Sequence, residues 1–213
     1  MATQRPNKQA DKDTKSGNED AACLYTSSKA QSQPFERKII TINAIKTVIG
    51  LGAAAAVVYL YVPIPIPSLP TAGHRLVYTL RLQTPAFLIL MAAILNVGMV
   101  RLHTPAINPI YGNAEHLVEF ERRFLANHVE QMLLNVPGQL VLVSFLGEGH
   151  MKVIPILSLI FVFGRVSFYI GYRMSYLRRT VGFMSSFLPS CLIWLVNAYF
   201  VGRALVHNET IKL

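Results

Sequence analysis

The chain has 213 residues, of which 52% are hydrophobic and 15% are charged, and its net charge is +9. Soluble domains carry about 25% charged residues, so this composition excludes an ordinary soluble fold and favours an integral membrane protein. The positive charge does not indicate nucleic-acid binding, because the basic residues lie at the ends of apolar segments rather than in an aromatic-rich groove.

Residues 1–38 form a polar tail that we predict to be disordered and cytosolic. The tail contains seven Lys/Arg and five Asp/Glu and few large aliphatic side chains. It therefore cannot bury enough apolar surface to offset the loss of chain entropy on folding. Cys23 lies in this tail and Cys191 in the last apolar segment, a separation that offers neither a metal motif nor a disulfide framework.

Five apolar segments follow the tail, and they predict an all-α protein because about 20 apolar residues span a bilayer as a helix. The predicted spans are 41–62, 82–100, 119–146, 153–172 and 182–206. The proline-rich stretch 63–70 predicts an extended connector after the first span. We therefore divide the chain into an extra span with its connector (39–81), a four-helix transmembrane domain (82–206) and a short lumenal tail (207–213).

The distribution of basic residues predicts the orientation of these spans. Fourteen Lys/Arg lie on the side of the membrane that holds the N-terminal tail, and five lie on the opposite side. Because positive residues accumulate on the cytosolic side, the N-terminus is predicted to be cytosolic and the C-terminus lumenal or external.

The third span carries three polar residues on one helical face. Arg123, Asn127 and Glu130 are spaced by four and three, which places them within about 60° of one another. A charged residue at the centre of a membrane helix costs roughly 2.5–3.5 kcal/mol, so we expect these residues to turn inward. Two interpretations stay open, an Arg–Glu pair that holds helices together and a ligand site.

A second polar stripe begins in the fourth span. Arg165, Tyr172 and Arg179 are spaced seven apart and share one face, with Phe168 between the first two. Such arginines suit carboxylates, because the guanidinium fork binds two oxygens at once. Arg173 and Arg178 are explained more simply as cytosolic anchors, whereas Arg165 lies too deep in the span to be one.

Three motifs occur in order on successive spans: ERRFLANHVE, FGRVSFYIGY and RRTVGF. Over about residues 82–206 they resemble the membrane-associated proteins in eicosanoid and glutathione metabolism (MAPEG), which include microsomal glutathione transferases and leukotriene and prostaglandin E synthases. The resemblance implies a four-helix membrane bundle that assembles as a homotrimer and holds glutathione between subunits, near the cytosolic side. The fold class expected here is thus a MAPEG-like bundle with one extra N-terminal span.

The resemblance also assigns roles to residues of the two stripes. It implies glutathione contacts for five of them and thiol activation for Arg179, in an enzyme that uses glutathione. The five are Arg123, Asn127, Glu130, Arg165 and Tyr172. Two departures weaken the enzymatic pattern, since Phe168 stands where the leukotriene-type enzymes have tyrosine and Gln131 replaces an aromatic residue. No metal site and no nucleic-acid partner is expected.

The five-span layout resembles most the branch of the family that contains transmembrane protein 79 (mattrin), which is associated with endomembrane and secretory traffic. The first hypothesis is therefore a non-catalytic protein of an endomembrane (endoplasmic reticulum, Golgi or lysosome) with a degenerate glutathione-type pocket. The alternative is a glutathione-dependent transferase or peroxidase that acts on lipophilic substrates. Binding of glutathione at millimolar concentration by the purified protein distinguishes a retained pocket from a lost one.

Overall fold

The computed structural model describes residues 36–108, 113–175 and 178–206, and within these ranges it contains helices and loops but no strand. An N-terminal helix, Glu36–Tyr61, precedes α2 (Ala72–Leu82), α3 (Thr84–Leu102), α4 (Glu119–Phe145), α5 (Val153–Met174) and α6 (Arg179–Val206). The predicted all-α fold is confirmed. The predicted disordered tail (1–38, apart from its last three residues) and lumenal tail (207–213) lie outside the described residues.

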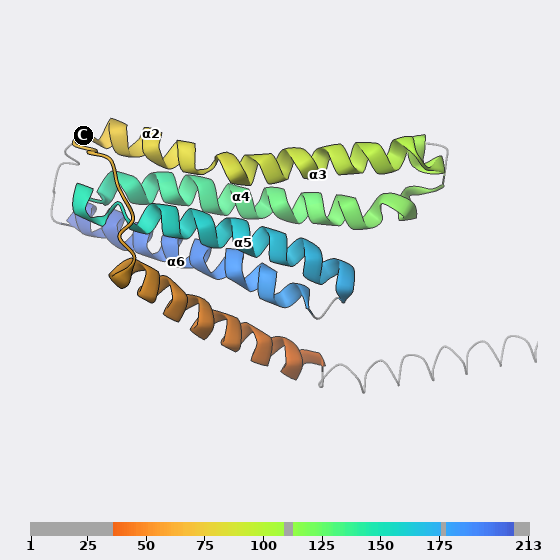
Figure 1. The fold of residues 1–213 in the computed structure, drawn as a ribbon, viewed down its shortest axis with the longest axis horizontal. Helices are drawn as coiled ribbons and strands as arrows, with labels where there is room; N and C mark the ends of the chain where they lie inside the picture. Colours follow the sequence, from red (N-terminus) through yellow and green to blue (C-terminus); the bar gives the residue numbers. More distant parts are fainter. Residues whose placement is uncertain (1–35, 109–112, 176–177, 207–213) are drawn as a thin grey trace, which may run out of the picture. The chain divides into compact units, whose positions relative to one another are not determined.

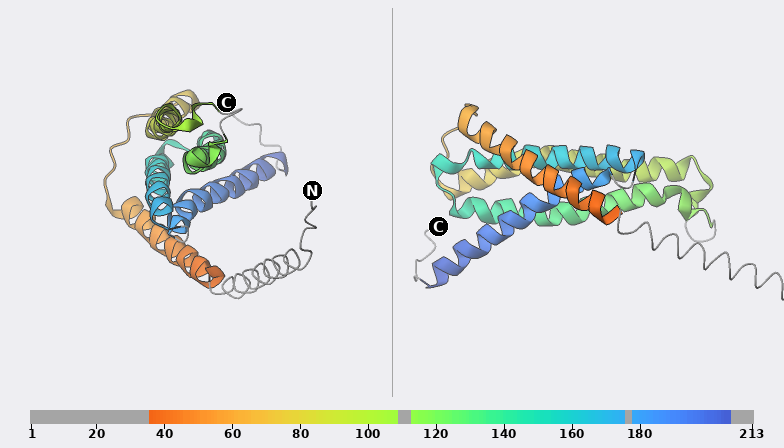
Figure 2. Two further views of the ribbon diagram at one scale, coloured as in Figure 1. Left: turned by 90° about the vertical axis from the view of Figure 1, so that its right-hand side faces the viewer. Right: turned by 90° about the horizontal axis from the view of Figure 1, so that it is seen from below.

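The chain divides into two units, 1–42 and 43–213. Of the first unit the structure describes the beginning of the N-terminal helix, Glu36–Ile42. The second unit holds the rest of that helix together with α2 to α6. In this unit α2 and α3 follow one another and pack against both α4 and α5, and α6 packs against α4 and α5 (Figures 1 and 2).

Four helical segments of the described chain are long and apolar enough to cross a membrane. They are Glu36–Tyr61, Ala72–Leu102, Glu148–Met174 and Arg179–Val206. The remaining predicted span, α4, has 27 residues and is about 40 Å long, but it is too polar to qualify by composition alone. Its polar side chains are shielded from lipid by neighbouring helices, because α2, α3, α5 and α6 all pack against α4.

The second predicted span begins earlier than expected, because α2 occupies residues assigned to the connector. Thr71 starts this helix with its hydroxyl, which accepts a hydrogen bond from the His74 amide. The helix breaks at Gln83, two residues before Pro85, which has no N–H for the carbonyl of Arg81. The Thr84 hydroxyl donates to that carbonyl instead, at 2.8 Å.

The helices α5 and α6 approach each other closely at two glycines. A Cβ atom added to Gly182 would lie 2.1 Å from the backbone nitrogen of Phe168 and 2.7 Å from the carbonyl oxygen of Gly164. One added to Gly164 would lie 3.0 Å from the backbone nitrogen of Ser186. Small residues let membrane helices pack backbone to backbone, and here they bring α6 against the part of α5 that carries Arg165.

Candidate functional site: the Arg165 and Tyr172 clusters

The helix α4 buries a stripe of residues that is unusually polar. The spacing of these residues alternates between three and four, as in a helix that packs along one seam. They are Glu121, Phe124, His128, Gln131, Asn135, Gly138 and Leu142. The predicted stripe of Arg123, Asn127 and Glu130 lies one residue before it, and thus about 100° round the helix.

Arg165 on α5 is fully buried at the centre of the bundle, where α4 and α6 supply its partners. Its Nε donates to Nδ1 of His128 at 3.0 Å, and its Nη1 donates to Oδ1 of Asn127 at 3.0 Å and to the Ser186 hydroxyl at 3.5 Å. The Phe168 ring covers the guanidinium, with 4.7 Å between Cζ and the ring centroid. We call Asn127, His128, Arg165, Phe168 and Ser186 the Arg165 cluster.

These contacts fix the tautomer of His128. The Arg165 Nε always carries a hydrogen and can only donate, so Nδ1 of His128 must be the acceptor. The other ring nitrogen, Nε2, then carries the hydrogen and donates to the carbonyl of Ala86 on α3, at 3.2 Å. His128 therefore connects α3 to α5 through α4.

The charge of Arg165 has no direct counter-ion within the described residues. None of the ion pairs among them includes Arg165, and its Nη2 is buried without a hydrogen-bond partner there. Glu130 contributes an attractive electrostatic interaction from outside contact distance. The cluster is thus stabilised by neutral acceptors and aromatic rings, and the Nη2 amino group of Arg165 remains without a hydrogen-bond partner among the described residues.

Arg123 lies at the surface, with 63% of its side chain exposed. It pairs with Glu119 one turn earlier on α4 and interacts electrostatically with Tyr172. Within the chain Arg123 therefore does not turn inward and does not pair with Glu130, the ion pair that was one of the two open interpretations. Those two residues are two turns apart, about 10 Å along the axis, and Glu130 is itself exposed.

Tyr172 is half-buried near the end of α5, between two arginines from neighbouring helices. Arg123 reaches it from α4, and the guanidinium of Arg179, the first residue of α6, lies 5.1 Å from the centre of its ring. The Tyr172 ring also packs against Phe120 and Phe168, at centroid distances of 5.0 and 5.6 Å. We call Arg123, Tyr172 and Arg179 the Tyr172 cluster.

The structure thus divides the six residues singled out from sequence. Asn127 and Arg165 lie in the buried Arg165 cluster, whereas Arg123, Tyr172 and Arg179 form the exposed Tyr172 cluster. Glu130 belongs to neither. Phe168 links the two clusters, because its ring contacts both the Arg165 guanidinium and the Tyr172 ring.

Sequence reasoning missed His128 and Ser186, and it also missed a second polar network deeper in the bundle. There the Gln83 side-chain amide donates to Oε1 of Gln139 at 2.9 Å and to the Ser158 hydroxyl at 3.1 Å. Gln139 in turn donates to Asn135 at 3.2 Å. The available signal was the spacing of His128, Gln131, Asn135 and Gln139 within an otherwise apolar half of a span.

Residues 82–199, more than half of the chain, match the MAPEG family, in the region that holds both clusters. The chain belongs to the MAPEG family. It is also similar to transmembrane protein 79 from Bos taurus and from Mus musculus, each 29% identical over 133 residues, or 62% of this chain. Those residues are 33% and 34% of the two relatives, so this MAPEG protein spans about a third of their length. No solved structure matches it.

Proposed function

We propose that this MAPEG protein is a non-catalytic component of an endomembrane, with a role in membrane or secretory-pathway organisation and a polar pocket that binds glutathione weakly. The observation that carries the proposal is the ring of Phe168 over the Arg165 guanidinium, where a hydroxyl donor is expected in an active enzyme. Arg165 is also engaged by His128, Asn127 and Ser186, so most of its donors serve the fold.

The remaining charged groups suit the binding of glutathione better than its activation. Glutathione has two carboxylates and one ammonium group, and when bound it supplies a thiol whose ordinary pKa is about 8.5. Arg123 and Arg179 are exposed and suit the carboxylates, and exposed Glu130 suits the ammonium group. A thiol-activating site needs its donors held in place by supporting side chains. Here Phe168 lacks the hydroxyl group of the expected tyrosine, and Gln131 lacks the ring of the expected aromatic residue.

We expect purified protein to bind glutathione at millimolar concentration and to show little or no conjugation of chlorodinitrobenzene. Loss of one preorganised donor lowers the rate by about 10²–10³ in sites of the oxyanion-hole type. Isothermal titration measures the binding, and absorbance measures the conjugation. Robust turnover that disappears in Arg179→Ala and survives in Arg178→Ala would contradict the proposal, since Arg178 is the adjacent exposed arginine.

A second candidate function, a glutathione-dependent transferase or peroxidase for lipophilic substrates, is favoured by the Tyr172 cluster. Two exposed guanidinium groups flank the Tyr172 ring, and such groups favour a thiolate over a thiol. The same turnover measurement separates the two candidates. Binding without turnover supports the first, and Arg179-dependent turnover supports the second.

The exposure of Glu130 supports a homotrimer. Glu130 lies almost halfway along α4, next to the exposed apolar side chains of Val129 and Leu133. A charged side chain facing lipid at this depth is costly, so we propose that neighbouring copies cover this face. Native mass spectrometry in mild detergent should show three copies, and a clean monomer would count against the assembly.

The positions of the helix ends support a cytosolic N-terminus. Arg101 at the end of α3 pairs with Glu115, and Arg173 at the end of α5 pairs with Glu121 at the start of α4. These basic residues therefore gather at one end of the bundle, as the positive-inside rule requires of the cytosolic side. A glycosylation tag on an extension after Leu213 should be modified and one within residues 1–38 should not; the reverse pattern would invert the orientation.

A further inference from the structure

A lateral cavity of about 720 Å³ lies between the N-terminal helix, the end of α4, the start of α5 and the outer face of α6. Its walls are almost entirely aliphatic and aromatic side chains. We propose that this cavity is a binding site for one acyl chain of a membrane phospholipid, with the phosphate of that lipid at Lys152. The cavity contains no member of the Arg165 or Tyr172 cluster, so the proposal stands apart from the proposed function.

The N-terminal helix supplies one wall of the cavity through a single face. This wall comprises Val48, Leu51, Gly52, Ala55 and Tyr59, spaced by three or four residues or adjacent. Its central positions are small, and a Cβ on Gly52 would meet nothing within 4 Å. The helix therefore leaves a hollow beside α6 instead of packing into it.

The opposite wall comes mainly from α6 and includes Pro189, which lies within this helix. Cys191 and Leu192 also line the cavity, and Leu192 is among the exposed large hydrophobic residues of α6. No described residue fills the space between the two walls. In a bilayer, an apolar space with this lining excludes water, because it offers water no hydrogen-bond partners.

The volume of the cavity decides between a protein helix and a lipid as its occupant. A membrane-spanning helix about 10 Å across and 30 Å long occupies roughly 2,400 Å³. That is more than three times the volume of the cavity, so a helix of a second copy can lie over its opening but cannot enter it. The volume falls instead in the range of about 300–1,000 Å³ typical of small-molecule sites.

The length of the cavity matches one leaflet of the membrane. Val48 and Tyr59 mark its extent along the N-terminal helix, and their separation of eleven residues corresponds to about 16 Å. The hydrocarbon core is about 30 Å thick, so one leaflet accounts for about 15 Å. An acyl chain that reaches from the membrane surface to the midplane has this length.

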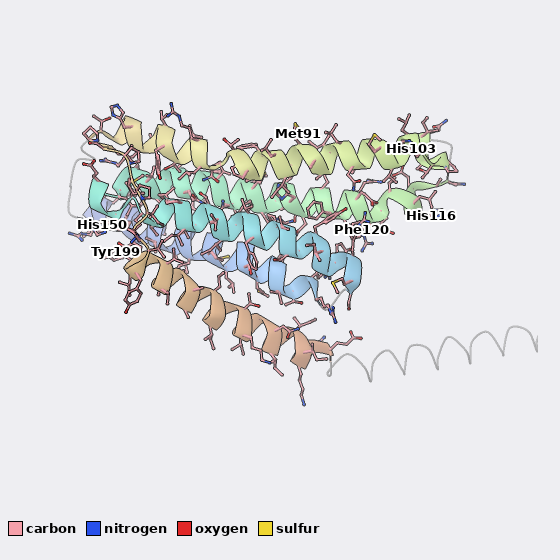
Figure 3. The ribbon with its side chains drawn as sticks, in the orientation of Figure 1. Met91, His103, His116, Phe120, His150 and Tyr199 are labelled. Carbon is pink, nitrogen blue, oxygen red and sulfur yellow. The ribbon has the colours of Figure 1, made fainter. Side chains whose placement is uncertain are left out.

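A lysine beside one end of the cavity provides N–H donors for a phosphate. His150 lines that end, which is opposite the Phe120 end of the bundle (Figure 3). The Lys152 ammonium donates to the Tyr59 carbonyl at 2.6 Å and lies 5.6 Å from the centre of the Tyr59 ring. An ammonium group has three N–H donors, so two remain for a phosphate, for which lysine acts as a point charge.

The test uses full-length protein in phosphatidylcholine vesicles that contain a phospholipid with a diazirine in the middle of its acyl chain. After illumination, mass spectrometry locates the labelled residues. We expect the label on the cavity face of α6, around Pro189 and Leu192. Ala55→Trp should lower that labelling about tenfold, since overpacking the cavity removes on the order of 1.4 kcal/mol of binding.

Ala53→Trp is the matched control, because Ala53 is an exposed position of the same helix outside the cavity lining. Its labelling should equal that of the unmodified protein, and gel filtration verifies that both variants are folded. Lys152→Gln should reduce labelling by the phospholipid but not by a diazirine fatty alcohol, which lacks the phosphate. Equal labelling of Ala55→Trp and Ala53→Trp, or cross-links that join two copies at this face, would overturn the proposal.

Discussion

Gly182→Ala should prevent the transmembrane bundle from assembling stably. The added Cβ would lie 2.1 Å from the nitrogen and 2.4 Å from the Cα of Phe168, both of which are backbone atoms. A side chain can relieve overpacking by changing its rotamer, and overpacking then costs about 1–3 kcal/mol. A backbone cannot do so, and we therefore expect a loss of several kcal/mol from a total stability of about 5–15 kcal/mol.

Thermal unfolding in detergent, followed by fluorescence-detected gel filtration, measures this loss. Gly98→Ala is the control, because Gly98 also lies within a helix but a Cβ there meets nothing within 4 Å. The control should unfold at the temperature of the unmodified protein or slightly above it, since alanine favours helix over glycine. If Gly182→Ala unfolded at the same temperature as Gly98→Ala, the close contact of α5 with α6 would be refuted.

Arg165→Ala should destabilise the protein by about 3–5 kcal/mol, whereas Arg123→Ala should leave its stability nearly unchanged. Removing the Arg165 guanidinium deprives His128 and Asn127 of their donors, and each buried acceptor left unsatisfied costs about 1–3 kcal/mol. The contact with the Phe168 ring is lost as well. Arg123 is exposed, and its removal loses only a surface pair with Glu119 and an electrostatic interaction with Tyr172.

The same unfolding assay compares these two arginine variants side by side. Arg165→Lys provides a further test, because lysine keeps the positive charge but not the planar fork that reaches His128 and Asn127 together. The stability of Arg165→Lys should be closer to that of Arg165→Ala than to that of the unmodified protein. A large loss for Arg123→Ala with a small one for Arg165→Ala would instead support the inward stripe predicted from sequence.

Apolar segments together with the family resemblance predicted the architecture but not which face of α4 is buried. The stripe of Arg123, Asn127 and Glu130 and the buried stripe through Phe124 and His128 have the same spacing, so periodicity cannot rank them. The cost of a buried charge favoured the first stripe, whereas within the single chain the second is buried, and Arg123 lies only one turn from the start of the helix. A long side chain there reaches polar surroundings without turning inward.

Arg165 shows the opposite case, since its depth within an apolar span correctly predicted burial. Its hydrogen-bond partners could not be predicted in the same way, because they lie on two other helices, α4 and α6, which meet α5 only through helix packing. The α5–α6 contact at Gly164 and Gly182 sets that packing, and Ser186 reaches Arg165 through it. Single glycines in apolar segments have no spacing signal strong enough to reveal such a contact.

The break between α2 and α3 bears on how the protein fits bilayers of different thickness. Together these helices cover 31 residues, about 46 Å, which exceeds a hydrocarbon core of about 30 Å. A rigid rod of this length could adapt only by changing its overall tilt. The helical hydrogen bonds are interrupted at Gln83, and the Gln83 side chain is hydrogen-bonded to Gln139 and Ser158. The helices α2 and α3 can therefore change their tilt separately, with Gln83 held in place between them. A hydrophobic mismatch of a few ångströms, such as that between the endoplasmic reticulum and the plasma membrane, is then absorbed at one residue instead of along the whole bundle.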